Sequence, residues 1–309
     1  MIPPRNFLIA VLLCLDHVAG AQVTYTGTTS ADAFVATGSS NYNNGQDLTG
    51  LNFGMAGALL IAPASFTNGE LQTVMRFNLA NAIALFDTTY GSNNWSIAGN
   101  SLELTGNFAA VGEHPNNALF PAITGGNFVI EWMADDHWLE GTGKPNMPMT
   151  DGVTYDSLTT LLLSAHEILC TNTYLPPGDN AHVTWPLPLN GNLMNDIASG
   201  GDVSFRLYAA DDQIGYLFNS HNFGNGNEPL IHVTAVPILR ILSGNFTNGF
   251  FHLAGIGETN VQYQIQANAD LSTTNWQTLE TVIADDAGVI QFDDPAVTNQ
   301  PQRFYRFSR

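Results

Sequence analysis

Basic residues are scarce in this sequence, and their shortage excludes whole classes of partner. The 309 residues include 8 Lys+Arg against 27 Asp+Glu, a formal net charge of -19 at pH 7, and Lys144 is the only lysine. Nucleic acids and anionic membranes are bound by basic patches that neutralise phosphate. We therefore expect no nucleic-acid partner. The acidity suits a soluble extracellular protein, and cation binding is the alternative interpretation.

Cysteine is almost absent as well. Of the two cysteines, Cys14 lies in an N-terminal segment that we expect to be removed, which leaves Cys170 alone in the mature chain. An intramolecular disulfide is then excluded. Stability must come from a hydrophobic core, which a chain of this length can bury.

Long hydrophobic runs are missing apart from one short run at the N-terminus. Arg5 precedes an apolar segment from Phe7 to Leu15, and Ala19-Gly20-Ala21 follows it. A positive charge, a short apolar run and a small-x-small tripeptide are the parts of a secretory signal peptide. The run is too short to span a bilayer, which takes about 20 residues. We predict a signal peptide over residues 1–21, a secreted or cell-surface protein, and no membrane insertion after cleavage.

Catalytic motifs are missing too. His166–Cys170 begins like a zinc-protease helix but lacks the second histidine one turn later. The sequence has no Gly-x-Ser-x-Gly elbow and no glycine-rich phosphate loop before a helix. His137, Tyr155 and His182 are the residue types of a lyase acid–base pair, but the sequence does not show that they converge. We predict that the protein is not an enzyme.

What the sequence has is the pattern of β-strands. Charged residues make up only 11% of the chain, and Gly, Asn, Thr and Ser are abundant, as in sheets and loops. Apolar and polar residues alternate with period two over 128–133, 203–209 and, most regularly, 261–268. Turn-forming clusters such as Gly125-Gly126-Asn127 separate these runs. Many short strands with such punctuation indicate a β-sandwich.

Helical periodicity is limited to one segment. Leu158, Leu161, Leu162 and Ala165 follow i, i+3, i+4, i+7 spacing, with Asp156 or Ser157 as the expected cap. The segments 80–86 and 193–198 are expected to form single turns. We interpret all three as crossovers packed on the sandwich.

A domain boundary is predicted near Pro237. Residues 229–234 have the pattern of a closing strand, and about seventy residues with their own strands follow. We therefore predict an all-β protein in which a jelly-roll-like β-sandwich over 22–237 precedes a small fibronectin type III-like β-sandwich over 238–309.

The first predicted domain carries a series of short motifs in a fixed order: Ala31–Val35, Asn41–Gly45, Val74–Asn78, Trp138–Gly141, Gly152–Tyr155, Gly215–Ser220 and Pro229–Val233. This series resembles the DNRLRE-type family of extracellular modules, some of which are carbohydrate-binding modules attached to polysaccharide lyases. Tyr155 stands where that family has tryptophan, and residues 80–127 fit its pattern more loosely. The resemblance implies an accessory, sugar-binding module.

The second predicted domain carries its own set of motifs: Gln264–Ala267, Asp270–Leu271, Trp276, Phe292–Pro295 and Gln302–Arg306. Their order and spacing resemble the fibronectin-like tail of many secreted proteins of Verrucomicrobia-like bacteria. The resemblance implies attachment or spacing as the role of this domain.

Sugar binding calls for aromatic rings that stack on pyranose faces and for amides or carboxylates that bind the hydroxyl groups. Residues 132–138 are the densest combination of aromatic, acid and imidazole in the chain. The candidate ligand-binding residues are Trp138, Trp185, Tyr155, Asp136, His137 and Glu140. Trp132 continues an alternating strand and is expected in the core, and Trp95 and Trp276 are also expected to be buried.

Metal binding is a second candidate. Asp135, Asp151 and Asp156, together with Asp136 and Glu140, surround a glycine-rich segment. Calcium takes six to eight oxygen ligands, which sandwich loops supply well. No cofactor is required, and a structural Ca²⁺ held by Asp135, Asp151 and Asp156 is the hypothesis. A solvated acidic loop is the alternative.

These observations favour a secreted, non-catalytic protein that binds extracellular polysaccharide or cell-wall glycan. The first alternative is a structural or adhesive component of the envelope or matrix, and the second is a polysaccharide-degrading enzyme. An exposed pair of rings at Trp138 and Trp185 would favour glycan binding, whereas a continuous apolar patch would favour adhesion.

Overall fold

The computed structural model describes residues 8–11, 22–40, 45–66, 69–107, 125–175, 181–189, 191–224, 226–296 and 302–309. Strands make up 52% of the chain and helices 12%. The protein is therefore all-β, as the alternating sequence pattern predicts. Among the described residues, no helix is both long enough and apolar enough to cross a bilayer.

The chain divides into two compact units. The large unit comprises residues 24–83 and 99–233, and the small unit combines residues 1–23, 84–98 and 234–309. The predicted domains, 22–237 and 238–309, are continuous in sequence, whereas these units are not, because residues 84–98 group with the C-terminal part of the chain.

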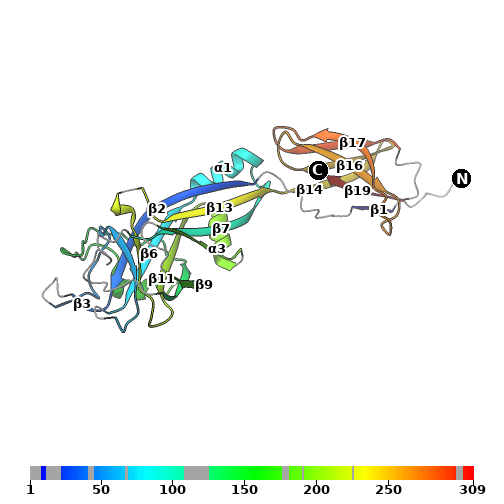
Figure 1. The fold of residues 1–309 in the computed structure, drawn as a ribbon. Coiled ribbons are helices and arrows are strands. Elements are labelled where there is room, and N and C mark those ends of the chain that lie inside the picture. Colours follow the sequence, from blue (N-terminus) through cyan, green and yellow to red (C-terminus); the bar gives the residue numbers. More distant parts are fainter. Residues whose placement is uncertain are drawn as a thin grey trace. The chain divides into compact units, whose positions relative to one another are not determined.

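An eight-stranded sheet is the main element of the fold (Figure 1). Its strands, in spatial order, are β10 (His182–Pro186), β7 (Trp95–Thr105), β13 (Leu230–Pro237), β2 (Val23–Ala36), β6 (Leu71–Asn78), β11 (Asp202–Ala209), β8 (Gly126–Met133) and β9 (His166–Tyr174). The pairings β10–β7, β2–β6, β6–β11, β11–β8 and β8–β9 are antiparallel. Two small sheets accompany it: β5 (Ala58–Ile61) with β12 (Tyr216–Asn219), and β3 (Ser39–Ser40) with β4 (Gln46–Asp47).

The C-terminal part of β2, residues 31–36, is buried on both faces, which explains its apolar sequence. On one face, Ala31, Ala33 and Val35 pack with Trp138 and with Leu158 of the helix α2 (Tyr155–Leu161). On the other face, Phe34 belongs to a second apolar cluster. Because successive strand residues point to opposite faces, Asp32 projects to the same side as Phe34.

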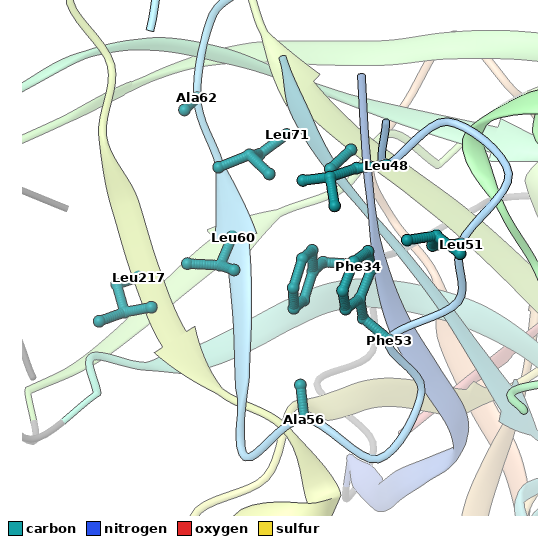
Figure 2. Packing of buried hydrophobic residues seen from close by; sticks show 10 residues of the cluster. Phe34, Leu48, Leu51, Phe53, Ala56, Leu60, Ala62, Leu71 and Leu217 are labelled. Atoms are coloured by element: carbon teal, nitrogen blue, oxygen red, sulfur yellow. The ribbon is translucent and has the colours of Figure 1, made fainter. Parts of the chain in front are cut away.

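Figure 2 shows the cluster around Phe34. The rings of Phe34 and Phe53 stack in parallel, with centroids 4.5 Å apart and an interplanar angle of 8°. Leu60 of β5 and Leu217 of β12 belong to the same cluster and come from the neighbouring two-stranded sheet (Figure 2). This packing fixes the position of the β5–β12 sheet against the main sheet.

The helices are α1 (Ala80–Tyr90), α2 (Tyr155–Leu161), α3 (Gly191–Ser199) and the 3₁₀ turn η2 (His221–Phe223). The predicted cap of α2 is wrong. Thr154 caps it instead, because the Ser157 amide donates to the Thr154 hydroxyl at 3.1 Å and the Thr154 amide donates to the Ser157 hydroxyl at 2.8 Å. The segments expected as single turns are full helices of 11 and 9 residues.

The small unit contains a sandwich of two sheets. One sheet is β14 (Arg240–Thr247), β15 (Phe250–Ile256) and β18 (Val289–Asp294); the other is β1 (Leu8–Val11), β19 (Gln302–Ser308), β16 (Gln262–Asn268) and β17 (Gln277–Ile283). Tyr263, Ile265 and Ala267 are buried between the sheets, as their alternation predicts. Tyr305 is also buried there, and its hydroxyl donates to the carboxylate of Asp294 at 2.8 Å.

Leu8–Val11 of the predicted signal peptide pair in parallel with residues 302–305 of β19. The other positions of the predicted signal peptide lie outside the described residues, as do Asn41–Asn44 of the DNRLRE-like motifs. The signal peptide stays a prediction.

Replacing Phe53 with alanine should lower the free energy of unfolding by about 3–5 kcal/mol, because it removes one ring of the buried stack and leaves a cavity. Urea denaturation followed by intrinsic fluorescence measures the change. Leu163→Ala, at a side chain that is 85% exposed, is the control and should change stability by less than about 0.5 kcal/mol. Equal effects of the two substitutions would contradict the assignment of this cluster to the core.

Candidate functional site

The two tryptophans expected to form an exposed platform are buried. Trp138 is 4% exposed and Trp185 is 9% exposed. The Trp138 indole donates to the Ser204 hydroxyl at 3.0 Å, and the Arg76 guanidinium lies 5.1 Å from its ring centroid. Because both rings are enclosed by protein, neither presents a face to a sugar, and the exposed pair that would favour glycan binding is not formed.

Trp185 belongs to the main sheet rather than to a loop. The residue lies in β10, opposite Leu102 of β7, and its ring packs edge-on against Phe128 at 5.0 Å. Pro186 is tolerated because β10 is the edge strand of the sheet.

The other predicted sugar-binding residues have separate surroundings. Tyr155 begins α2 and donates its hydroxyl to Glu70 at 3.1 Å. The His137 side chain is 97% exposed, with Nδ1 3.4 Å from Asp135. Burial, together with the nearby charges of Asp196 and Asp202, raises the pKa of Asp136 to about 6. Of these residues, only Glu140 belongs to a cluster of three possible metal ligands.

The three predicted calcium ligands do not converge. Asp135 accepts a hydrogen bond from the His137 amide, exposed Asp151 accepts two from Thr142, and exposed Asp156 lies in the first turn of α2. Within the described part of the chain, a single group brings three possible metal-ligand atoms within 4.8 Å of one another, and its members are Asp32, Glu140 and His221. We call these three residues the acid–histidine cluster.

The acid–histidine cluster joins three segments that are far apart in sequence. His221 of η2 places Nδ1 3.1 Å from Asp32 Oδ2 and Nε2 3.2 Å from Glu140 Oε1. Asp32 comes from β2, and Glu140 comes from the segment between β8 and α2. The adjacent Asp32 carboxylate raises the pKa of His221 in spite of burial, and burial raises the pKa of Glu140.

Further polar groups orient the two carboxylates. Asp32 Oδ2 accepts from the Thr29 hydroxyl at 3.0 Å and from the His221 amide at 2.9 Å. The Asn222 side-chain amide donates to Glu140 Oε1 at 2.7 Å and to the Gly54 carbonyl at 3.0 Å. These bonds hold the carboxylates in defined orientations.

The fully buried side chain of Asn52 fixes the segment that carries Glu140. Its Nδ2 donates to the carbonyls of Glu140 at 2.6 Å and Val153 at 2.8 Å. Its Oδ1 accepts from the amides of Gly54 at 3.1 Å and Gly143 at 3.0 Å. All four of its hydrogen-bonding positions are therefore used, and we call this arrangement the Asn52 clamp.

Glycines surround the Asn52 clamp because the backbone approaches it closely. A Cβ atom at Gly143 would lie 1.8 Å from the Asn52 carbonyl oxygen, and one at Gly54 would lie 2.0 Å from the Glu140 carbonyl oxygen. Gly141 also needs a left-handed backbone, with φ of 80°. The glycine-rich character of this segment thus serves packing around Asn52.

A pocket of about 200 Å³ shares η2 with the acid–histidine cluster. Its lining residues are Phe34, Ala56, Gly57, Ala58, Leu60, Asn107, Pro145, Leu217 and Phe223. Phe223 is 37% exposed. Asn107 donates its side-chain amide to the carbonyl oxygen of the Asn219 side chain at 2.7 Å. We call this site the Phe223 pocket.

Local sequence patterns indicate these sites only in part. Glu140 was singled out, whereas Asp32, His221 and Phe223 were not. The available signal for Asp32 was a charged residue inside an apolar strand, Ala31-Asp32-Ala33-Phe34-Val35. No local pattern marks His221 or Phe223, because their role depends on a contact between segments about 80 or more residues apart.

A second group of ionisable residues lies on the main sheet. Glu103 of β7 contacts His182 of β10 at 2.8 Å and His232 of β13 at 3.0 Å. Burial acts to raise the pKa of Glu103, but the hydrogen bonds to both histidines outweigh it and lower that pKa. We call these residues the Glu103 row. They occupy three adjacent strands, and their possible ligand atoms do not all lie within 4.8 Å of one another.

Replacing Asn52 with alanine should lower the free energy of unfolding by about 3 kcal/mol or more, because four buried backbone groups lose their partner. Chemical denaturation measures the loss. Asn195→Ala, at an exposed position of α3, should change stability by no more than about 0.5 kcal/mol. A small loss at Asn52 would contradict its role as the clamp.

Asp136→Asn should stabilise the protein at pH 7.5. A folded-state pKa of about 6, above the ordinary 3.8, means that ionisation of Asp136 costs stability as the pH rises through this window. After allowance for solvent screening, the gain is about 1–2 kcal/mol at pH 7.5, and most of it disappears at pH 4. Thermal unfolding at both pH values measures it, with exposed Asp286→Asn as the control. A gain that is the same at both pH values would refute this explanation.

No family model matches the sequence, and no curated protein matches it. The DNRLRE-like and fibronectin-like resemblances are therefore not confirmed. Among solved structures, native alpha-2-macroglobulin from Escherichia coli spanning domains MG0-NIE-MG1 is 11% identical, with 90% of this chain and 89% of that chain covered. The TM-score is 0.13, which is too low to support an argument from fold.

Proposed function

We propose that the protein is a secreted, non-catalytic module that binds an extracellular polysaccharide at the Phe223 pocket. The observation that carries the proposal is an exposed aromatic ring on a pocket that also contains an amide side chain. An aromatic face stacks on the apolar face of a sugar ring, and amides bind its hydroxyl groups. This site replaces the one expected at Trp138 and Trp185.

The size of the pocket supports binding of part of a chain. Its volume of about 200 Å³ is below the range of about 300–1,000 Å³ for sites that enclose a small molecule. We expect it to take one sugar ring of a polysaccharide, with the neighbouring rings lying on the surface.

The charge of the protein favours a neutral glycan. With a net charge of -19, the protein repels a polymer of uronates or sulfated sugars. Glu140 adds a carboxylate near the pocket, because its partner Asn222 is adjacent to Phe223 in η2. We therefore propose that neutral polysaccharides bind more tightly than acidic ones.

We propose binding without turnover because the residues that could act as acid and base, His137, Tyr155 and His182, each have a different partner. His182 contacts Glu103, Tyr155 donates to Glu70, and His137 contacts Asp135 at an exposed position. General acid–base catalysis needs such groups within hydrogen-bond reach of one reacting centre.

An adhesive role is the second candidate, and one observation favours it. Met55, Met147 and Met149 are exposed on two segments joined by hydrogen bonds from Asn52 to Met149 and from Met55 to Gly143. Exposed methionines adapt to varied partner surfaces. Such a surface suits a protein partner in an envelope or matrix better than it suits a sugar.

Phe223→Ala should weaken polysaccharide binding at least tenfold, because it removes the stacking ring while the core remains intact. Affinity electrophoresis and pull-down with neutral and uronate-containing polysaccharides measure the effect. Phe250→Ala is the matched control, since Phe250 is an equally exposed aromatic residue in the small unit. Unchanged binding by Phe223→Ala would overturn the site. Failure of the unaltered protein to bind any polysaccharide would overturn the function and favour the adhesive role.

A further inference from the structure

The acid–histidine cluster contains a carboxylate oxygen whose surroundings do not satisfy it. Asp32 is 0% exposed, and its Oδ1 has no hydrogen-bond partner among the described residues. A buried carboxylate oxygen without a donor is costly, because it has left water without a replacement. His221 Nδ1 also lacks a well-aligned hydrogen-bond partner there, although it lies 3.1 Å from Asp32 Oδ2.

The two oxygens of Asp32 therefore differ in what they can bind. Oδ2 already accepts from the Thr29 hydroxyl and the His221 amide. These bonds fix the orientation of the carboxylate and leave Oδ1 available. In metal sites, ligand carboxylates are oriented in this way by hydrogen bonds from residues that do not touch the metal.

Glu140 and His221 complete a set of three ligands. One possible ligand atom from each of Asp32, Glu140 and His221 lies within 4.8 Å of the other two. Asn222 orients Glu140 through its Oε1, and the Asn52 clamp holds the Glu140 backbone. Separate hydrogen bonds thus position the two carboxylate ligands before any ion binds.

We propose that Asp32, Glu140 and His221 form a binding site for one divalent first-row transition-metal ion, with Zn²⁺ as the ion of reference. Two carboxylates and one imidazole suit zinc and related ions, whereas calcium prefers six to eight oxygens. Three protein ligands also leave a coordination position for water. The site shares no ligand with the predicted calcium site of Asp135, Asp151 and Asp156, and it does not depend on sugar binding.

A bound ion would connect β2, the segment that carries Glu140, and η2. Because η2 also carries Phe223, the ion would hold one wall of the Phe223 pocket. An ion that binds the folded state alone stabilises it by mass action. Zinc should therefore raise the melting temperature of the protein in proportion to the logarithm of its free concentration.

The test uses protein expressed from the full sequence, treated with EDTA, dialysed and titrated with ZnCl₂ alone by calorimetry. We expect one zinc ion per chain, and at least tenfold weaker binding by Glu140→Gln and His221→Gln, each of which replaces a zinc ligand with an uncharged, weakly coordinating amide. His182→Gln in the Glu103 row is the matched control and should bind zinc as the unaltered protein does.

Two results would overturn the proposal. One is the absence of stoichiometric zinc binding by the unaltered protein. The other is binding that survives both cluster substitutions and is lost in His182→Gln, which would place zinc at the Glu103 row. Because the titration contains no sugar, a failure to bind zinc is distinguishable from a failure to bind polysaccharide.

If the cluster variants do not fold, the unaltered protein still decides the question. Thermal unfolding is then compared in EDTA, in ZnCl₂ and in CaCl₂. A rise in melting temperature with Zn²⁺ that Ca²⁺ does not reproduce supports the proposal. No rise with Zn²⁺, or the same rise with both ions, overturns it.

Discussion

The Asn52 side chain is the interaction on which both candidate sites depend. Its four hydrogen bonds tie residues 52–54 to the backbone of Glu140, Gly143 and Val153. The segment that contains Gly143 and Val153 also supplies Glu140 to the acid–histidine cluster. The residues just beyond Gly54 supply Ala56 and Gly57 to the Phe223 pocket. A fully satisfied buried amide specifies one arrangement of irregular backbone, because any other arrangement leaves polar groups without partners. The surrounding glycines follow from this constraint.

The alternating pattern predicted the all-β fold because strand faces are a local property. Residues 261–268 bury the positions that their period of two selects, whereas residues 128–133 are buried on both faces of the main sheet. The cap of α2 shows the limit of local reasoning: Asp156, Ser157 and Thr154 are all cap-forming residue types, and the backbone path decides which one caps. The lengths of α1 and α3 exceeded expectation because tertiary packing stabilises helices with weak periodicity.

The candidate site was predictable only in part. Glu140 was identified from its local surroundings, but Asp32 and His221, its partners, lie 108 and 81 positions away in the sequence. Trp138 sits beside acids and a histidine in sequence, yet its ring turns to the α2 face of β2, where Ala31, Ala33 and Val35 leave room for it. Composition indicates which residues can bind sugar. It does not indicate which side of a sheet a ring will cover.

Burial of Asp32 and Glu140 calls for an explanation beyond stability. Removing carboxylates from water costs free energy, and apolar residues of similar volume are often as stable or more so in such places. One imidazole between two carboxylates cannot neutralise both, and Oδ1 of Asp32 remains without a partner. A chain selected for stability alone would have little reason to keep this arrangement beneath an apolar pocket. A divalent cation would balance the two negative charges, and it would do so where η2 joins the cluster to Phe223. The short turn η2 thus carries one residue of each site, His221 of the cluster and Phe223 of the pocket.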